Sequence, residues 1–204
     1  FSYPQPWFLP GKGFLFLHTY YQSGRGLRWM TSADGRNWSD RHLLAHIQEG
    51  HYQISWPHGG KVGTAFNYHP TAFRGNAQQK GLNWRTNLYY IETDDMGQHW
   101  RTAAGALIET PITAPDNPAL VHNYEDEGLL CYTVDLKFDT GGNPIVLYVT
   151  SRSWKPGPDF GPRTWTTAHW KGDHWEIRPV TTSGNNYDTG ALRANLPRPS
   201  SSGA

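Results

Sequence analysis

Short apolar and aromatic runs alternate with turn-forming residues along this chain. No window of about a dozen residues shows the periodicity of an amphipathic helix, whereas the runs have the length and the Val, Tyr, Phe and Trp content of β-strands. This pattern predicts an all-β fold. The expected strands cover residues 13–21, 26–32, 51–56, 61–69, 87–93, 128–135, 144–151, 165–170 and 175–180.

Two turns between these runs carry a related motif. Residues 93–100 read TDDMGQHW and fit the Asp-box pattern Ser/Thr-x-Asp-x-Gly-x-x-Trp, and residues 32–38 read SADGRNW, a shorter version. Each motif predicts a hairpin turn in which the hydroxyl and carboxylate bond turn amides, Gly adopts a positive φ and Trp packs beneath. The residues assigned to these scaffold turns are Ser32, Asp34, Gly35, Trp38, Thr93, Asp95, Gly97 and Trp100.

The spacing of the two motifs predicts a repeated unit. Their closing residues, Trp38 and Trp100, are 62 residues apart, which suits a four-stranded antiparallel propeller blade of about 40–50 residues with a loop insertion. A closed propeller of about 4–8 blades mostly needs a longer chain. We therefore expect a partial β-propeller in residues 1–192, with about three blades and the start of a fourth at 185–192. Residues 193–204 form a Pro/Ser/Gly tail that is expected to be disordered.

Composition limits the classes of partner. The formal net charge is +1, so the chain lacks the strong positive charge of a dedicated nucleic-acid-binding protein. No apolar run is long enough to span a membrane, and no secretory signal is visible. Ten Trp and eleven Tyr supply rings that pack in sheets and can stack on sugars. The expected partner is an acidic polysaccharide or oligosaccharide, rather than nucleic acid or a membrane.

Polar residues interrupt three of the expected strands or their ends. His51 opens one strand within GHYQIS, and His69 ends the next within FNYHP, directly before a proline that forces the chain into a loop. A third cluster begins at Tyr132. In a propeller such positions can converge at one end of the central channel, and His is the side chain that titrates near neutrality.

Longer motifs resemble a known family. GHYQIS, FNYHP, TNLYY, DLKFDTGGNPIVLYVTS, PRTWTTAHW and NNYDTG are similar to motifs of the bacterial BNR-repeat family of β-propellers, over nearly all of residues 1 to about 192. This family includes the propeller-type ulvan lyases and many glycan-associated proteins. The resemblance implies a secreted or periplasmic, carbohydrate-active protein. Its most specific implication is a polysaccharide lyase that cleaves a uronic-acid-containing glycan by β-elimination.

β-Elimination sets the chemistry that such a site must provide. The reaction removes the proton α to a uronate carboxylate, so it needs a cation on the carboxylate, a base near the ring carbon and an acid at the leaving oxygen. The resemblance implies that His51 and His69 act at the reacting sugar and that Tyr132 is the base or acid. It assigns Arg163 as the group that neutralises the carboxylate.

Alternatives remain open for two of these roles. Tyr124 or Tyr148 could replace Tyr132, and Arg152 could replace Arg163. The residues expected to contact the substrate are Asn67, Arg152, Trp56 and Tyr187.

The resemblance implies no required cofactor, although some lyases of this type hold a structural zinc through His and Cys. His122 and Cys131 are the candidate ligands here, but they lack His or Cys partners at the usual spacing, so no metal site is assigned. A structural zinc or calcium ion is left open. Cys131 is the only cysteine, which excludes an intrachain disulfide, and its apolar neighbours favour a buried strand residue.

Two other function classes fit the same fold. A sialidase-like hydrolase also carries Asp boxes, but no Arg-Ile-Pro signature precedes the first box. Other glycosidases use paired carboxylates, yet Asp135 and Asp139 would lie about 13 Å apart along one strand, which is too far for the usual pair. In a non-catalytic glycan-binding propeller, Trp56, Trp84 and Trp154 would stack on sugars and the histidines would be structural.

Overall fold

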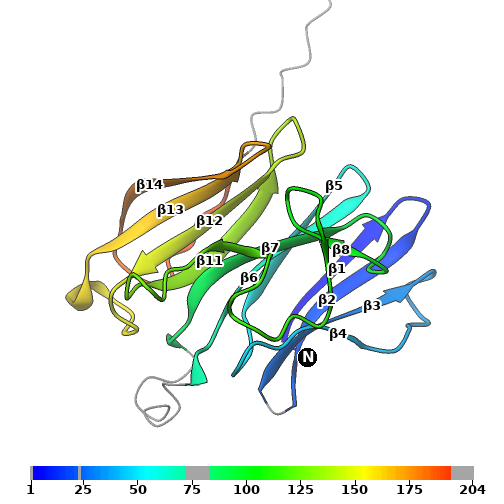
Figure 1. Ribbon diagram of the computed structural model, residues 1–204, viewed down its shortest axis with the longest axis horizontal. Coiled ribbons are helices and arrows are strands. Elements are labelled where there is room, and N and C mark those ends of the chain that lie inside the picture. Colours follow the sequence, from blue (N-terminus) through cyan, green and yellow to red (C-terminus); the bar gives the residue numbers. More distant parts are fainter. Residues whose placement is uncertain (1, 23, 72–82, 194–204) are drawn as a thin grey trace, which may run out of the picture.

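The computed structural model describes residues 2–22, 24–71 and 83–193, and these residues form three antiparallel β-sheets. The sheets follow one another along the chain and lie side by side, coloured blue, cyan to green, and yellow to orange in Figure 1. The all-β prediction is confirmed. No helix within the described ranges is long and apolar enough to cross a membrane. The expected tail lies outside these ranges, apart from its first residue, Arg193.

Within each sheet the strands are joined mainly in chain order, as in the blades of a propeller. The first sheet contains β1 (Ser2–Leu9), β2 (Gly13–Tyr21), β3 (Arg25–Ser32) and β4 (His42–Ala45). The second contains β5 (Gln53–His58), β6 (Lys61–Tyr68), β7 (Thr86–Thr93), β8 (Trp100–Arg101) and β9 (Leu107–Ile108), with β10 (Leu120–His122) paired to β7. The third contains β11 (Leu130–Phe138), β12 (Pro144–Ser151), β13 (Arg163–Trp170) and β14 (Trp175–Ser183), and a 3-10 turn, η3 (Pro158–Phe160), precedes β13.

The strands expected from the sequence are all present, with ends shifted by at most three residues. The pattern did not reveal β1, β4 or the short strands β8, β9 and β10. β1 contains two prolines, Pro4 and Pro6, and the other four strands have two to four residues each. Such segments are too short or too interrupted to show the alternation on which strand prediction rests.

Residues 185–192 contain no strand, which corrects the expected start of a fourth blade. The Asp188 carboxylate accepts hydrogen bonds from backbone amides at the beginning of this segment and holds a turn there. Further along, the Leu192 amide donates to the Asp135 side chain (2.8 Å) instead of pairing with the backbone of β11. The segment therefore lies against β11 without extending the sheet.

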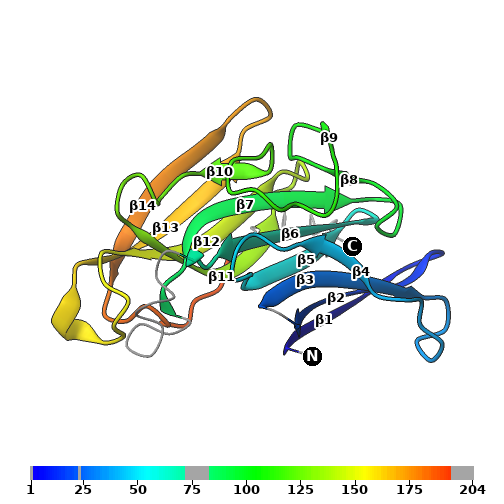
Figure 2. The ribbon, with the colours of Figure 1, turned by 60° about the horizontal axis from the view of Figure 1, so that its bottom comes forward.

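The first strands of neighbouring sheets lie next to each other. Between β1 and β5, the Trp7 indole donates to the Ser55 hydroxyl (2.7 Å), and the Tyr3 and Tyr52 rings meet edge to face, 4.7 Å apart. Contacts at both ends show that β1, β5 and β11 run in the same direction. We name the end where these strands begin the upper end and the other the lower end. In Figure 1 the upper end is turned towards the bottom of the picture, where β1 begins. The sheets fan out in Figure 2, with β14 at one margin.

Two apolar layers hold the three sheets together. Each fully buried large apolar side chain contributes about 1.5–3 kcal/mol relative to exposure. Because neither layer is buried without both of its sheets, neighbouring sheets stabilise each other. The layer between the first and second sheets includes Leu15, Leu17, Leu27, Phe66, Tyr89 and Trp100, and the layer between the second and third includes Ala65, Leu88, Tyr90, Val146 and Tyr148.

Hydroxyl and carboxylate groups organise the turns between the third and fourth strands of the first two sheets. The Ser32 hydroxyl accepts from the Gly35 amide (2.8 Å), and the Thr93 hydroxyl accepts from the Gly97 amide (2.9 Å). The Asp95 carboxylate accepts from the Thr93 hydroxyl, from the His99 amide and from the His99 imidazole. These bonds satisfy turn amides that no strand pairing reaches.

The tryptophans that follow these turns differ in environment. Trp38 is partly buried and its ring lies 5.5 Å from that of Phe16, whereas Trp100 is fully buried in the layer between the first two sheets. Gly97 has a φ of 89°, and a Cβ at this position would lie 2.8 Å from the Trp29 ring. The close approach of this turn to the first sheet therefore requires glycine.

His51 ties three segments together in the interior. Its Nδ1 donates to the Asn67 carbonyl (2.9 Å), and its Nε2 accepts from the Ile47 amide (2.9 Å). Asn67 in turn donates its side-chain amide to the Cys131 carbonyl (2.9 Å) in β11. Burial lowers the pKa of His51 to about 4, so the ring is neutral at pH 7.

Replacing Asp95 by Ala is expected to lower the free energy of unfolding by about 1 kcal/mol, because the turn loses bonds to one hydroxyl and one backbone amide. Chemical denaturation measures the change. Asp94→Ala is the matched control, since the neighbouring Asp94 is exposed and should show little change. Equal destabilisation by both variants would contradict the assigned role of the Asp95 carboxylate.

Stability should depend on pH through His51. Its pKa is about 4 when folded and about 6.5 when unfolded, so between these values the unfolded chain binds a proton that the folded chain does not. The free energy of unfolding should therefore fall as pH is lowered from about 6.5 to 4, by about 3 kcal/mol from this residue. Urea unfolding at several pH values measures this dependence. The free energy of unfolding of His51→Gln should vary less with pH than that of the wild type, whereas the exposed control His174→Gln should follow the wild type.

Candidate functional site

Two buried arginines from different sheets meet at the upper end. Arg25 begins β3 and is 3% exposed, and Arg85 directly precedes β7 and is 7% exposed. The Tyr52 ring lies beside both guanidinium groups, with its centroid 4.7 Å from Cζ of Arg25 and 4.0 Å from Cζ of Arg85. These distances are those of cation–π contacts, which favour a cation beside an aromatic ring.

Further tyrosines surround the two arginines. Arg85 lies 4.8 Å from the Tyr132 ring and 5.1 Å from the Tyr187 ring, and Arg25 lies 5.1 Å from the Tyr21 ring. Tyr21 and Tyr187 are exposed, so the cluster is open to solvent on one side. All three sheets and the segment after β14 contribute to it.

The two guanidinium groups have no carboxylate partner. Within the described ranges no ion pair involves Arg25 or Arg85, and the buried Nε atoms of both have no hydrogen-bond partner. Burying an unpaired cation is costly. The surrounding fold therefore maintains a site with positive potential and unused N–H donors, and such a site favours an anion.

One backbone segment places Arg25 next to His69. The Arg25 amide donates to the Glu49 carbonyl (3.1 Å), and the His69 amide donates to the Gly50 carbonyl (2.9 Å). Gly50 has a φ of 103°, and a Cβ there would overlap the backbone of Arg25 at 2.3 Å. Only glycine lets this segment bridge the first and second sheets so closely.

His69 turns one ring nitrogen towards Arg25. Its Nδ1 donates to the Trp84 carbonyl (3.0 Å), which leaves Nε2 as an acceptor 3.5 Å from Nη1 of Arg25. Burial, followed by the charges of Arg85 and Arg25, lowers the pKa of His69 well below its usual range. The imidazole is therefore neutral at pH 7, and its Nε2 is unprotonated.

Tyr21 and Tyr132 differ in the state of their hydroxyl groups. Burial alone would raise the pKa of Tyr21, but a hydrogen bond from Ser2 and the nearby charge of Arg25 outweigh it and lower the pKa. Tyr132 is buried and donates its hydroxyl to the Asn83 carbonyl (2.7 Å), and burial raises its pKa. Tyr21 is therefore the better proton donor at this end of the molecule.

His51 and Asn67, two of the residues expected at the site, lie in the interior instead. Both ring nitrogens of His51 are bonded to backbone groups, and Asn67 accepts from the Tyr52 amide (3.3 Å) and donates to the β11 backbone. Neither side chain is exposed. The geometry therefore does not fit the expected contact of either residue with a sugar, and it supports structural roles.

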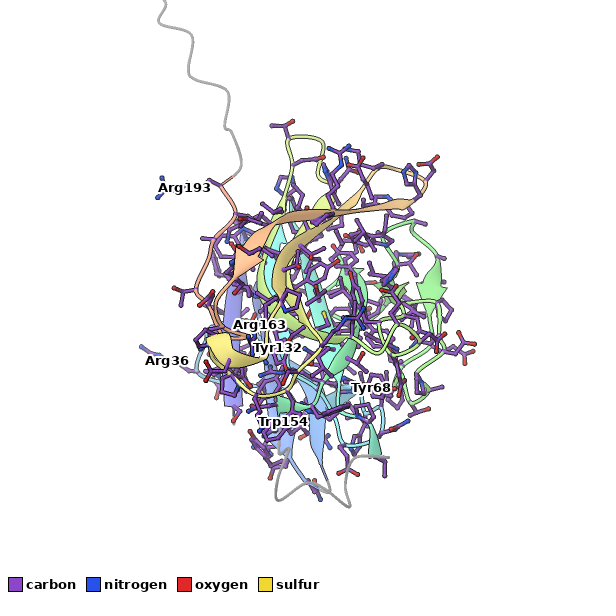
Figure 3. The ribbon with its side chains drawn as sticks, turned by 90° about the vertical axis from the view of Figure 1, so that its left-hand side faces the viewer. Arg36, Tyr68, Tyr132, Trp154, Arg163 and Arg193 are labelled. Atoms are coloured by element: carbon purple, nitrogen blue, oxygen red, sulfur yellow. The ribbon has the colours of Figure 1, made fainter. Side chains whose placement is uncertain are left out.

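Arg163 anchors the segment after β14. Its Nε donates to the Asn186 side chain and its Nη2 to the Lys155 carbonyl (2.5 Å), and it is fully buried. Figure 3 shows Arg163 and Tyr132 close together within the molecule, with Arg36 and Arg193 at its margin. This position does not fit the expected role of Arg163 as the carboxylate-neutralising group.

The other expected residues divide between the two ends of the molecule. Tyr187 lies with Arg25, Arg85 and the tyrosines around them, a group that we name the arginine cluster. The Tyr187 hydroxyl donates to the side chain of Asn83. Trp56 lies near the lower end of β5 and contacts Lys137. Arg152 is exposed just beyond β12. Of the predicted residues, the structure therefore brings His69, Tyr132 and Tyr187 together with the two arginines.

The sequence contained a signal for the arginines that was not used. The third strand of each sheet begins with or directly follows an arginine: Arg25 for β3, Arg85 for β7 and Arg163 for β13. Because the blades repeat, equivalent positions face the same end of the molecule. Aligning the strands expected at 26–32, 87–93 and 165–170 would have placed these arginines at similar positions.

The two weak metal candidates do not form a site. His122 lies 2.5 Å from the Glu127 carboxylate, and Cys131 is buried in the layer between the second and third sheets, where burial raises the pKa of its thiol. No group of three His, Cys, Asp or Glu residues in the described part of the chain is arranged to hold a metal ion.

Comparisons with known proteins agree with this architecture. The sequence matches the BNR repeat-containing family over residues 1–183. A polysaccharide lyase of family PL25, an ulvan lyase bound to -[GlcA(1-4)Rha3S]-, superimposes with a TM-score of 0.69 at 15% identity, and a further structure of a PL25 ulvan lyase with 0.67 at 14%. A protein of unknown function from Dyadobacter fermentans DSM 18053 gives 0.57 at 12%.

The alignments cover most of this chain but a smaller share of each similar protein. The alignments cover 86% of this chain but 42% of the ulvan lyase, and 88% of this chain but 54% of the Dyadobacter protein. No curated protein matches the sequence. The structural similarities show a shared fold, and the family match extends over most of the sequence. The chain therefore belongs to the BNR repeat-containing family.

Proposed function

We propose that this chain is part of a polysaccharide lyase that cleaves a uronic-acid-containing glycan by β-elimination. The site is the arginine cluster, on three blades of a partial β-propeller. One observation carries the proposal: the neutral Nε2 of His69 lies beside Arg25, and Arg25 and Arg85 are buried without a carboxylate partner. The similarity of fold to an ulvan lyase supports it.

Arg25 and Arg85 would bind the uronate carboxylate. Guanidinium groups form strong, often bidentate, hydrogen bonds with carboxylates. Charge builds on the carboxylate as the neighbouring carbon loses its proton, so fixed cations stabilise the transition state more than the ground state. The tyrosine rings hold both guanidinium groups without neutralising them, which keeps the donors available.

His69 would accept the proton α to the carboxylate at Nε2. The electron pair of that C–H bond then forms the carbon–carbon double bond, and the bond to the leaving glycosidic oxygen breaks. Tyr21 would donate the proton to this oxygen, because its hydroxyl lies on the open side of the cluster and Arg25 stabilises the resulting phenolate. Tyr52, Tyr132 and Tyr187 would form the walls that orient the sugar.

A glycoside hydrolase fits the geometry less well. Asp135 accepts from the Leu192 amide and pairs with Lys137 (3.2 Å), and Asp139 is bonded to its own hairpin and to His169. Neither aspartate lies among the residues of the arginine cluster. The paired carboxylates that glycosidases use are thus missing from that cluster in the described part of the chain.

A non-catalytic glycan-binding site is the second candidate function. The same exposed tyrosines and unpaired arginines would also hold an acidic sugar without cleaving it. The products distinguish the classes, because a lyase creates an unsaturated sugar that absorbs ultraviolet light, a hydrolase creates reducing ends without this absorbance, and a binding protein creates neither.

On a glucuronic-acid-containing polysaccharide, His69→Ala should lower kcat by about 10² or more, because the proton acceptor is lost. Arg85→Gln should lower kcat/KM by about 10²–10³, because one fixed cation is lost from the transition state. The rate of ultraviolet absorbance increase measures both effects.

Arg36→Gln is the matched control for Arg85→Gln, since Arg36 lies on an exposed turn and should keep wild-type rates. Wild-type turnover by both His69→Ala and Arg85→Gln would remove the assigned site. Glycan binding without any product from the wild-type chain would favour the non-catalytic alternative.

A further inference from the structure

A cavity lies at the lower end of β5 and β11, away from the arginine cluster. We name it the lower cleft. Its volume is about 310 Å³, and an adjoining hollow of about 260 Å³ shares much of its lining. This size lies at the low end of the range for small-ligand sites. The lower cleft is lined by Trp56, His58, Lys137, Phe138, Asp139, Thr140 and Leu192.

Aromatic rings form fixed walls of the lower cleft. The Trp56 side chain is 37% exposed, and its ring is supported by that of Trp7, with centroids 5.2 Å apart. The Phe138 ring lines the lower cleft but is buried, because it stacks on His58 at 5.1 Å and lies 5.0 Å from Nζ of Lys61, so Trp56 is the aromatic ring that a ligand can reach. The C–H face of a pyranose ring is weakly positive and apolar, so it is complementary to the negative face of an aromatic ring.

Lys137 brings an ammonium group to the same cavity. Its Nζ lies 2.8 Å from the centroid of the Trp56 ring and 3.2 Å from the Asp135 carboxylate. An ammonium group has three N–H donors, and among the described residues Asp135 is the one acceptor that Lys137 meets. The ammonium group can therefore also donate to an anionic group that enters the lower cleft.

The β11–β12 hairpin beside the lower cleft is held rigidly by Asp139. This carboxylate accepts from the amides of Gly141 (2.8 Å) and Asn143 (2.9 Å) and from the His169 imidazole (2.9 Å). Burial opposes ionisation, but the bonds from Asn143 and His169 outweigh it and lower the pKa of Asp139 to about 2. The wall is therefore formed before a ligand arrives, which reduces the entropy cost of binding.

We propose that the lower cleft is a second sugar-binding site, which takes a pyranose ring that carries a carboxylate. The ring packs against the exposed part of Trp56, and the carboxylate accepts a hydrogen bond from Lys137. This site goes beyond the proposed cleavage reaction and does not depend on it. It would let one molecule hold an acidic glycan at two points, which raises the overall affinity for the polymer.

Isothermal titration calorimetry with sodium D-glucuronate tests the lower cleft. The titration uses the full chain with Arg85→Gln, so that binding at the arginine cluster is suppressed. In this background, Trp56→Ala and Lys137→Gln should each weaken the remaining binding by about tenfold or more, the loss expected for one stacked ring or one charged hydrogen bond. Lys137→Arg should retain binding.

Matched controls separate the lower cleft from general effects of substitution. Phe8→Ala removes an exposed aromatic ring from β1 outside the lower cleft and should leave the affinity unchanged. Methyl glucoside, which has the same ring without a carboxylate, should bind at least tenfold more weakly than D-glucuronate. Lys137→Gln decides the test if Trp56→Ala fails to fold.

Three results would overturn the inference. These are the loss of all D-glucuronate binding in Arg85→Gln alone, unchanged binding in the Lys137→Gln variant, and equal affinity for methyl glucoside. Each of these can occur whether or not the wild-type chain produces the unsaturated product. Failure of the lower cleft is therefore distinguishable from failure of the proposed lyase function.

Discussion

The packing of each sheet on the next is the constraint on which both ends of the molecule depend. It places β1, β5 and β11 side by side and in the same direction, so residues near the starts of these strands gather at one end and residues near their finishes gather at the other. The arginine cluster and the lower cleft are two consequences of this one arrangement. Neither exists within a single sheet, because each draws its side chains from at least two.

Unpaired positive charge is the second organising feature. Arg25, Arg85 and Arg163 occupy similar positions in their sheets, yet their surroundings differ. Arg163 donates through Nε and Nη2 to an amide oxygen and a carbonyl, whereas the first two leave Nε without a partner and face tyrosine rings. A repeated scaffold can thus place one residue type in a different chemical environment in each sheet.

The two histidines show how local bonding separates structure from chemistry. His51 and His69 are both buried, and burial is the largest cause of a lowered pKa for both. Backbone groups occupy both nitrogens of His51. His69 uses one nitrogen for its position and turns the other, an acceptor, towards Arg25 at the upper end.

The sequence by itself determined the all-β class, the positions of the main strands and the repeated blades, because alternation and turn chemistry are local properties of the chain. It also indicated His69, Tyr132 and Tyr187, but it could not separate them from His51, Asn67 and Arg163, which carry equally suitable groups. Only the tertiary structure decided which of these face the arginines. Arg25, Tyr52 and Arg85 lie far apart along the chain, and their proximity arises solely from the packing of the sheets.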